Sequence, residues 1–220
     1  MTAKGDFFPR RVNNWFANAS YAADVRIDGF GLVEIPAPVT ADADGILDGA
    51  SIATALDTTV FADAYNDEVM AKFGRNVVVA ASGAATSKVT VHGYDYLGQP
   101  MQEELTLNGT SAVLSSKCFR HVTRIEAGVT AATTIDVGWG NKLGLPYKLL
   151  KSEAEFVSGV AASDAGTFVA GNTTTPSKTS AEPRGTYTPH ANNVPNGTRD
   201  YRIAGYWDRS DLYGLAQFNG

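Results

Sequence analysis

Apolar and polar residues alternate most regularly between Val77 and Trp139, and this two-residue period predicts β-strands. Strands are predicted over residues 77–80, 87–94, 101–107, 119–127 and 133–139, the first two as a hairpin. In residues 119–127 the spacing of Phe119, Val122 and Ile125 departs from strict alternation, which indicates a bulge. Short, glycine-containing connections separate the segments. The pattern predicts an all-β protein whose core is an antiparallel β-sandwich or a small barrel.

One segment has the period of a helix. Phe61, Tyr65, Val69 and Phe73 recur at four-residue spacing within residues 59–73, and Gly74 follows as a C-terminal stop. Aromatic stripes of this kind are usually buried seams. We therefore expect one short helix that packs against the core.

The regions on either side keep neither period for long. Residues 1–58 hold small apolar clusters between Asn, Gly, Asp and Pro, and are predicted to form an extended N-terminal arm. Residues 59–148 form the predicted core with its preceding helix. Residues 149–220 are expected to contain a hairpin of 155–160 with 167–170, a long Pro- and Thr-rich loop, and aromatic anchoring strands.

Both outer regions carry clusters of large aromatic residues. A buried aromatic side chain gains about 1.5–3 kcal/mol over an exposed one, so these clusters need a partner surface. That surface is either the chain's own domain or another subunit, and aromatic residues are enriched at interface hot spots. The candidate interface residues are Phe7, Phe8, Trp15, Phe16, Trp207, Tyr213 and Phe218.

Composition excludes several classes of partner. The formal charge is −5, and the 18 Lys and Arg residues are scattered, so no nucleic-acid interface is expected. No apolar run approaches the roughly 20 residues of a membrane helix, and no membrane partner is predicted. The single cysteine, Cys118, cannot form an internal disulfide. With no apolar signal stretch at the start, the sequence indicates folding in a reducing cytoplasm.

No group of residues predicts catalysis. The three histidines, His92, His121 and His190, have no partner at metal-ligand spacing. Asp42, Asp44 and Asp48 lack the late Glu of a calcium loop and are better read as a polar turn. Cys118 lies three residues from His121, which on a strand places the two side chains on opposite faces. We expect no metal, no cofactor and no enzymatic activity.

Several stretches resemble virion structural proteins of tailed bacteriophages, particularly capsid cement or decoration proteins. The resemblance covers about two-thirds of the chain and is carried by β patterning and turn glycines. In the core it rests on GRNVVVAASG, VTVHGYDYLGQPMQEELTLNG, FRHVTRIEAG and TTIDVGWGNKLGLPY. In the C-terminal region it rests on GTFVAGNTTTP and RGTYTPHANNVPNGTRDYRI.

The resemblance implies a homodimeric or homotrimeric clamp on the outer surface of the virion capsid, bound between subunits of the major capsid protein. Such a protein is made in the bacterial cytoplasm and stabilises the shell without catalysis. Two alternatives remain open. One is a neck, tail-tube or other tail-associated protein; the other is a carbohydrate-binding module that uses Tyr94, Tyr96 and Trp139.

Overall fold

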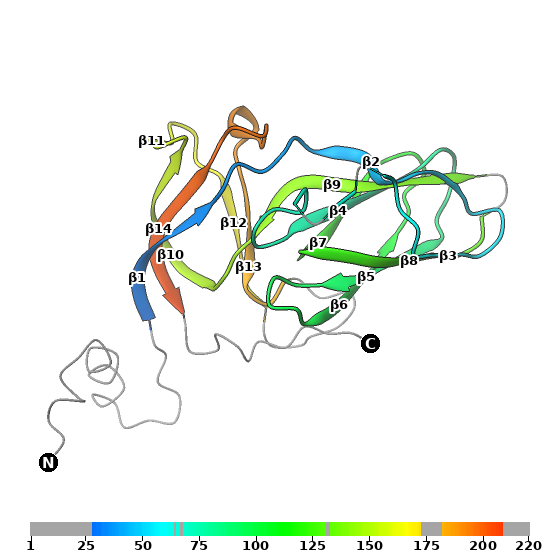
Figure 1. Ribbon diagram of the computed structural model, residues 1–220, viewed down its shortest axis with the longest axis horizontal. Helices are drawn as coiled ribbons and strands as arrows, with labels where there is room; N and C mark the ends of the chain where they lie inside the picture. Colours follow the sequence, from blue (N-terminus) through cyan, green and yellow to red (C-terminus); the bar gives the residue numbers. More distant parts are fainter. Residues whose placement is uncertain (1–27, 64, 67, 131–132, 173–181, 209–220) are drawn as a thin grey trace, which may run out of the picture.

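The computed structural model describes residues 28–208 except 64, 67, 131–132 and 173–181, and these residues are mostly β-strand (Figure 1). The strands pair antiparallel throughout. One 3-10 turn, η1 (Ala191–Asn193), is the only helical element in this part of the chain. The prediction of an all-β antiparallel fold is confirmed.

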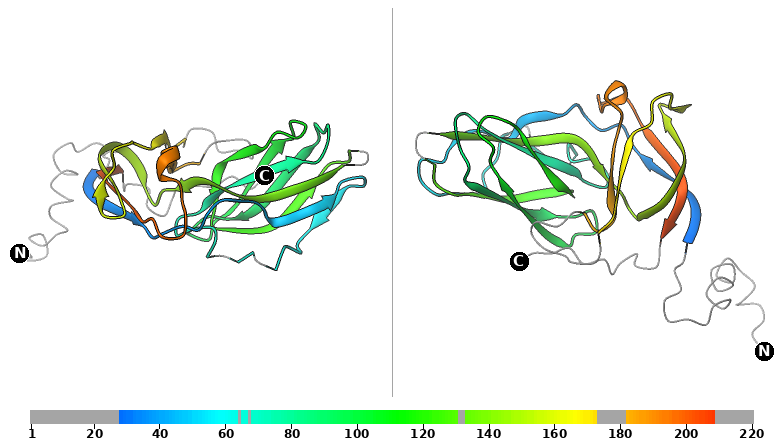
Figure 2. Two further views of the ribbon diagram at one scale, coloured as in Figure 1. Left: turned by 90° about the horizontal axis from the view of Figure 1, so that it is seen from above. Right: turned by 180° about the vertical axis from the view of Figure 1, so that it is seen from behind.

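Two curled sheets form a sandwich (Figures 1 and 2). The central sheet contains β12 (Thr167–Ala170), β13 (Gly185–Thr188), β9 (Thr134–Gly144), β4 (Arg75–Ala81) and β7 (Val113–Phe119), with β2 (Asp42–Ser51) also paired to β9. The facing sheet contains β3 (Leu56–Thr58), β8 (His121–Ala127), β5 (Lys88–Tyr94) and β6 (Pro100–Thr106). The first core is mainly aliphatic and includes Ile46, Val79, Val91, Ile125 and Val137.

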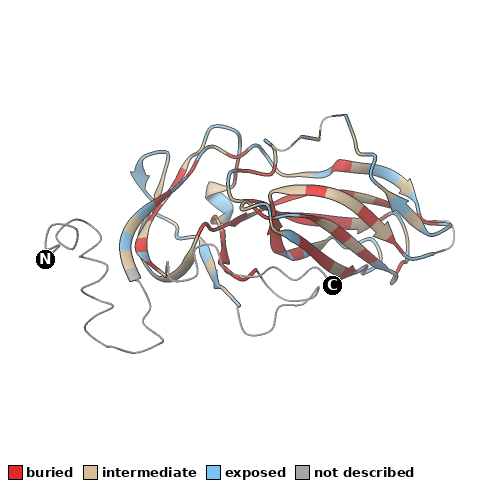
Figure 3. Cartoon of the chain, turned by 60° about the horizontal axis from the view of Figure 1, so that its bottom comes forward, coloured by how far each residue is buried: buried red, intermediate tan, exposed pale blue. Residues whose placement is uncertain are grey.

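A third sheet, the end sheet, closes the other end of the molecule. It contains β1 (Asp28–Ile35), β14 (Tyr201–Asp208), β10 (Lys148–Val157) and β11 (Val160–Ala161). Its inner face packs against the end of the central sheet and forms a second core that includes Leu143, Tyr187, Tyr201, Ile203 and Trp207. Figure 3 shows the buried residues concentrated on the sandwich strands, with more exposed and intermediate residues on the end sheet.

Strand β9 joins the two cores. Its first residues pair with β2 and its last residues pair with β13, so one continuous strand changes neighbours as it leaves the sandwich. Ile135, Val137 and Trp139 face the first core, as their alternation predicted, whereas Leu143 belongs to the second.

A buried arginine lies beside this strand. The Arg75 guanidinium donates to the carbonyls of Gly140 (2.7 Å), Val39 (2.9 Å) and Val69 (3.2 Å), which come from three separate segments. Its Nη2 has no hydrogen-bond partner among the described residues. Burial lowers the pKa of Arg75 to about 10, because the charged form is poorly solvated there.

The predicted helix over residues 59–73 is wrong. The described residues of this segment form separate turns, and Ala71 has a positive φ of 60°. Phe61, Tyr65 and Val69 still pack against the first core, and the Tyr65 hydroxyl accepts the Val122 N–H (2.6 Å) at the bulge in β8. An isolated helix of this length is marginal in water, so contacts with the core decide the local conformation. The spacing predicted burial correctly and the predicted bulge is confirmed.

Two predicted hairpins are also wrong. β4 and β5 lie in opposite sheets, because β4 pairs with β7 and β9 while β5 pairs with β6 and β8. β4 is an interior strand of the central sheet, so both of its edges are taken by β7 and β9, and the sequence did not predict β7. Likewise, β10 pairs with β11 and β14, whereas β12 pairs with β13.

The sequence also assigned residues 28–58 to an N-terminal arm. In the structure they supply one strand to each sheet: β1 pairs with β14, β2 with β9 and β3 with β8. Two of these strands therefore lie within the sandwich. The reason is that the small apolar clusters of this region, such as Ile46 and Ile52, complete the first core.

Candidate interaction surface

The structure tests only one of the seven candidate interface residues. Phe7, Phe8, Trp15, Phe16, Tyr213 and Phe218 lie outside the described residues. Trp207 is fully buried in the second core, where its Nε1 donates to the Gly31 carbonyl (3.0 Å). A side chain closed off by its own chain has no surface left for a partner, so the prediction that Trp207 is an interface residue is wrong.

The neighbours of Trp207 form an exposed apolar surface instead. Side chains alternate between the two faces of a strand, so Ile203 and Trp207 point inward while Tyr206 points outward. On the adjacent strand β1, Phe30 and Leu32 also point outward, with exposed fractions of 61% and 59%. The Phe30 and Tyr206 rings contact each other edge to face, with centroids 5.5 Å apart. We call Phe30, Leu32, Ala204 and Tyr206 the outer apolar face.

This face lies where both terminal segments join the fold. Asp28 and Asp208 are partners in the β1–β14 pair, so residues 1–27 and 209–220 attach at the same end of the end sheet. β1 is an edge strand: it pairs with β14 along one side, and no described strand pairs with its other side. Exposed edges with apolar side chains are pairing sites for other segments.

Sequence reasoning missed the outer apolar face because it treated residues 28–35 as part of an arm. A two-residue period was present in the sequence: Phe30 and Leu32 fall on one face of an extended segment, and Val33 and Ile35 fall on the other. Which of these two apolar faces is buried depends on β10 and β13, which lie more than a hundred residues away in the sequence.

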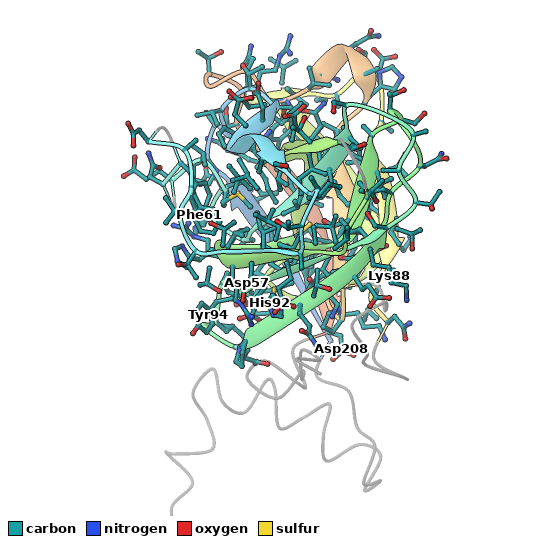
Figure 4. All side chains as sticks on the ribbon, turned by 90° about the vertical axis from the view of Figure 1, so that its right-hand side faces the viewer. Asp57, Phe61, Lys88, His92, Tyr94 and Asp208 are labelled. Carbon is teal, nitrogen blue, oxygen red and sulfur yellow. The ribbon has the colours of Figure 1, made fainter. Side chains whose placement is uncertain are left out.

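The outer surface of the facing sheet has a different character. Lys88, His92 and Tyr94 follow one another along β5, with Asp57 beside His92 (Figure 4). Arg124 forms a two-pronged hydrogen bond with Asp57 (2.7 and 2.8 Å) and also pairs with Glu126. These groups are largely solvated and paired with one another, which is typical of an exposed strand surface.

Buried ionisable groups hold the sheets together. Glu103 on β6 accepts the backbone N–H groups of Ser116 (2.7 Å) and Lys117 (2.8 Å) on β7, which joins the facing sheet to the central sheet. Desolvation raises the pKa of Glu103 and lowers that of Lys117. The Lys117 ammonium donates to the Gln102 carbonyl (2.9 Å).

A second buried cluster lies where β13 begins. Arg184 pairs with Asp95 (2.7 Å) and Glu182 (3.3 Å), and its guanidinium lies 4.9 Å from the centre of the Tyr96 ring. Asp95 also accepts the amide of Leu97 (2.9 Å) and so closes the loop between β5 and β6. These charges fix loops against the central sheet, which is a structural role.

The cysteine and two of the histidines have structural surroundings. Burial raises the pKa of the Cys118 thiol well above its usual value, which disfavours the reactive thiolate. His92 contacts Glu126 (3.1 Å), and His190 accepts the Asn192 N–H at the start of η1 (3.2 Å). Among the described residues no group of three or more His, Cys, Asp or Glu is placed to hold a metal ion. Within the same residues no helix is long and apolar enough to cross a membrane.

The three aromatic residues considered for sugar binding do not form one platform. Trp139 is buried, and its Nε1 donates to the Thr40 carbonyl (2.9 Å). The Tyr96 hydroxyl donates to the Pro146 carbonyl (2.6 Å), and only Tyr94 is substantially exposed. Trp139 does line a groove of about 470 Å³ on the central sheet, whose other lining residues include Leu114 and Lys142.

Comparison with known proteins finds no family model, no curated protein and no solved structure that matches this chain.

Proposed function

We propose that this chain is a non-catalytic capsid cement protein of a tailed bacteriophage. It would bind between major capsid protein subunits on the outside of the head, as a homodimer or homotrimer, and stabilise the shell by covering its joints. The observation that carries the proposal is the position of both terminal segments. They join the fold side by side at the Asp28–Asp208 pair, next to an exposed apolar face.

This arrangement suits a protein that connects neighbours. The central and facing sheets form a sandwich in which buried ionisable groups join strands and loops. Segments 1–27 and 209–220 contain six of the seven candidate interface residues. Segments that become ordered on binding lose conformational entropy but can cover a large area.

Location and copy number on purified particles test the proposal. We expect several hundred copies of the chain per virion, retained on tail-free heads and arrayed on the outer shell, by cryo-electron microscopy and quantitative mass spectrometry. About a dozen copies at a vertex or along the tail would instead favour a neck or tail component. Absence from the particle would overturn a virion role altogether.

A further inference from the structure

The outer apolar face is unusual because β1 and β14 carry apolar side chains on both faces, and only the inner set packs against the second core. Val33 and Ile35 of β1 are buried in the second core, whereas Phe30 and Leu32 on the same strand are more than half exposed. Ion pairs of Arg202 with Glu34 (3.1 Å) and Asp200 (3.3 Å) border the face at one end. An apolar centre with a polar rim is the usual anatomy of a protein interface.

The edge of β1 adds main-chain hydrogen-bonding capacity to this face. All eight residues of β1 are in register with β14, and the strand has no described neighbour on its other side. An extended segment can therefore add itself as a further strand while its side chains cover Phe30 and Leu32. This is the geometry of β-strand addition, in which main-chain bonds give affinity and alternate side chains give specificity.

The N-terminal segment has the chemistry to occupy this site. Residues 1–27 contain Phe7, Phe8, Trp15 and Phe16, and they carry four basic and two acidic side chains, a formal charge of +2. The whole chain carries −5, so the other 193 residues carry −7. A basic, aromatic segment thus complements an acidic body with an exposed apolar face.

The length of the segment allows it to reach a neighbouring molecule. Twenty-seven residues can span at most about 90 Å when extended, whereas an eight-residue strand is about 27 Å long. Residue 27 is joined directly to the start of β1, so the segment of the same copy would have to reverse direction to cover its own face. A segment from a second copy needs no reversal, and mutual exchange covers both faces of a two-fold symmetric pair.

We propose that the outer apolar face and the free edge of β1 bind the N-terminal segment of a second copy of this chain. This inference deepens the homo-oligomeric part of the proposed function and rests on it for its biological role. Self-association by segment exchange is nevertheless a property of the purified protein and does not depend on the virion.

Complementation between two full-length variants tests the exchange. The face variant is Leu32→Asp, which keeps the segment and damages the face. The segment variant replaces Phe7, Phe8, Trp15 and Phe16 by Ser, which keeps the face and damages the segment. We expect the wild-type protein to be oligomeric in sedimentation equilibrium and each variant alone to be monomeric. An equimolar mixture of the two should form a one-to-one complex, because one intact face then meets one intact segment.

Leu114→Asp is the matched control. Leu114 is a leucine of nearly equal exposure (56% against 59% for Leu32) on β7 of the central sheet. The Leu114→Asp protein should associate like the wild type, and circular dichroism should show the same strand content in all variants. If the Leu114→Asp protein lost association while the Leu32→Asp protein still associated like the wild type, the proposed surface would be overturned. A wild-type protein that stays monomeric, or two variants that fail to complement, would overturn exchange between copies.

The two proposals fail in different experiments. A chain that exchanges segments in solution but is absent from virions would refute the capsid role alone. A chain that is abundant on heads but monomeric in solution, with no complementation, would refute segment exchange and leave the capsid location standing.

Discussion

The two cores of this protein are stabilised in different ways. The first core, inside the sandwich, consists mainly of Val, Ile, Leu, Met and Ala side chains with one tryptophan. The second core, behind the end sheet, is built around Tyr187, Tyr201 and Trp207, each of which has a polar atom in a specific hydrogen bond. Aliphatic burial is non-directional, whereas each of these aromatic residues also requires a correctly placed acceptor.

The difference shows how an end sheet can be attached to a complete sandwich. The aromatic rings span the distance between β14 and β13, and their polar ends bind Glu155, Asn193 and Gly31 in three different segments. The second core therefore fixes the orientation of the end sheet as well as burying apolar surface. Four experiments probe this contrast, from the largest expected effect to the smallest.

Arg75→Met should have the largest effect, because Arg75 lies at the junction of the cores. The substitution leaves three carbonyls without their donor, and each buried unsatisfied group costs about 1–3 kcal/mol. We expect the free energy of unfolding to fall by about 3 kcal/mol or more. Tryptophan fluorescence during urea unfolding, measured in a Trp15→Phe background, would report on Trp139 in the first core and Trp207 in the second. We expect both cores to lose stability together. Wild-type stability in this variant would contradict a junction role.

Gly45→Ala should disturb the first core alone. A Cβ at this position would lie 2.3 Å from the Trp139 ring, so the substitution forces the indole to move and should cost about 1–3 kcal/mol. In a Trp139→Phe background the outer ring atoms are missing, so Gly45→Ala should lower the free energy of unfolding by less. Gly128→Ala is the control, because its nearest neighbour would be 3.6 Å away. Equal costs with and without the indole would refute this packing account.

High pH should weaken the second core. Burial raises the pKa of Tyr201 to about 12, so the folded protein keeps a proton that the unfolded chain releases near pH 10. The stabilisation is complete below pH 10 and is lost as the pH rises towards 12, at up to about 1.4 kcal/mol per pH unit. Burial also raises the pKa of Tyr96 and Tyr187, which adds to the loss, and lowers that of Arg75, which opposes it. The contribution of Tyr201 is therefore read as a difference: urea titrations between these pH values should show a smaller pH slope in Tyr201→Phe than in the wild type. Tyr94→Phe, at an exposed position, should leave it unchanged.

Asp57→Asn should have the smallest effect. The Arg124 hydrogen bond lowers the pKa of Asp57, but both side chains are substantially exposed and solvent screens their attraction. We expect no measurable change in thermal stability at low or high salt. A loss comparable to that of Arg75→Met would show that the outer surface of the facing sheet contributes far more than its exposure indicates.

Much of the fold could be predicted from local patterns. The alternation of Val89 and Val91, and of Ile135 and Val137, correctly placed both pairs inside, and the irregular spacing after Phe119 indicated the bulge in β8. The candidate site could not be predicted in the same way. Trp207 and Tyr206 are adjacent aromatic residues, yet one is fully buried and the other is on the outer face.

The sequence by itself determined most of the strands between residues 77 and 139 and which of their side chains share a face, because side-chain direction in a strand depends only on a two-residue period. Only the tertiary structure decided which strands are neighbours and which face is covered. Those choices depend on contacts between segments far apart in the chain, such as β4 with β9 and β1 with β14. Packing against the first core likewise accompanies turns rather than a helix at residues 59–73, and the pairing of β1 with β14 leaves Phe30 and Leu32 exposed.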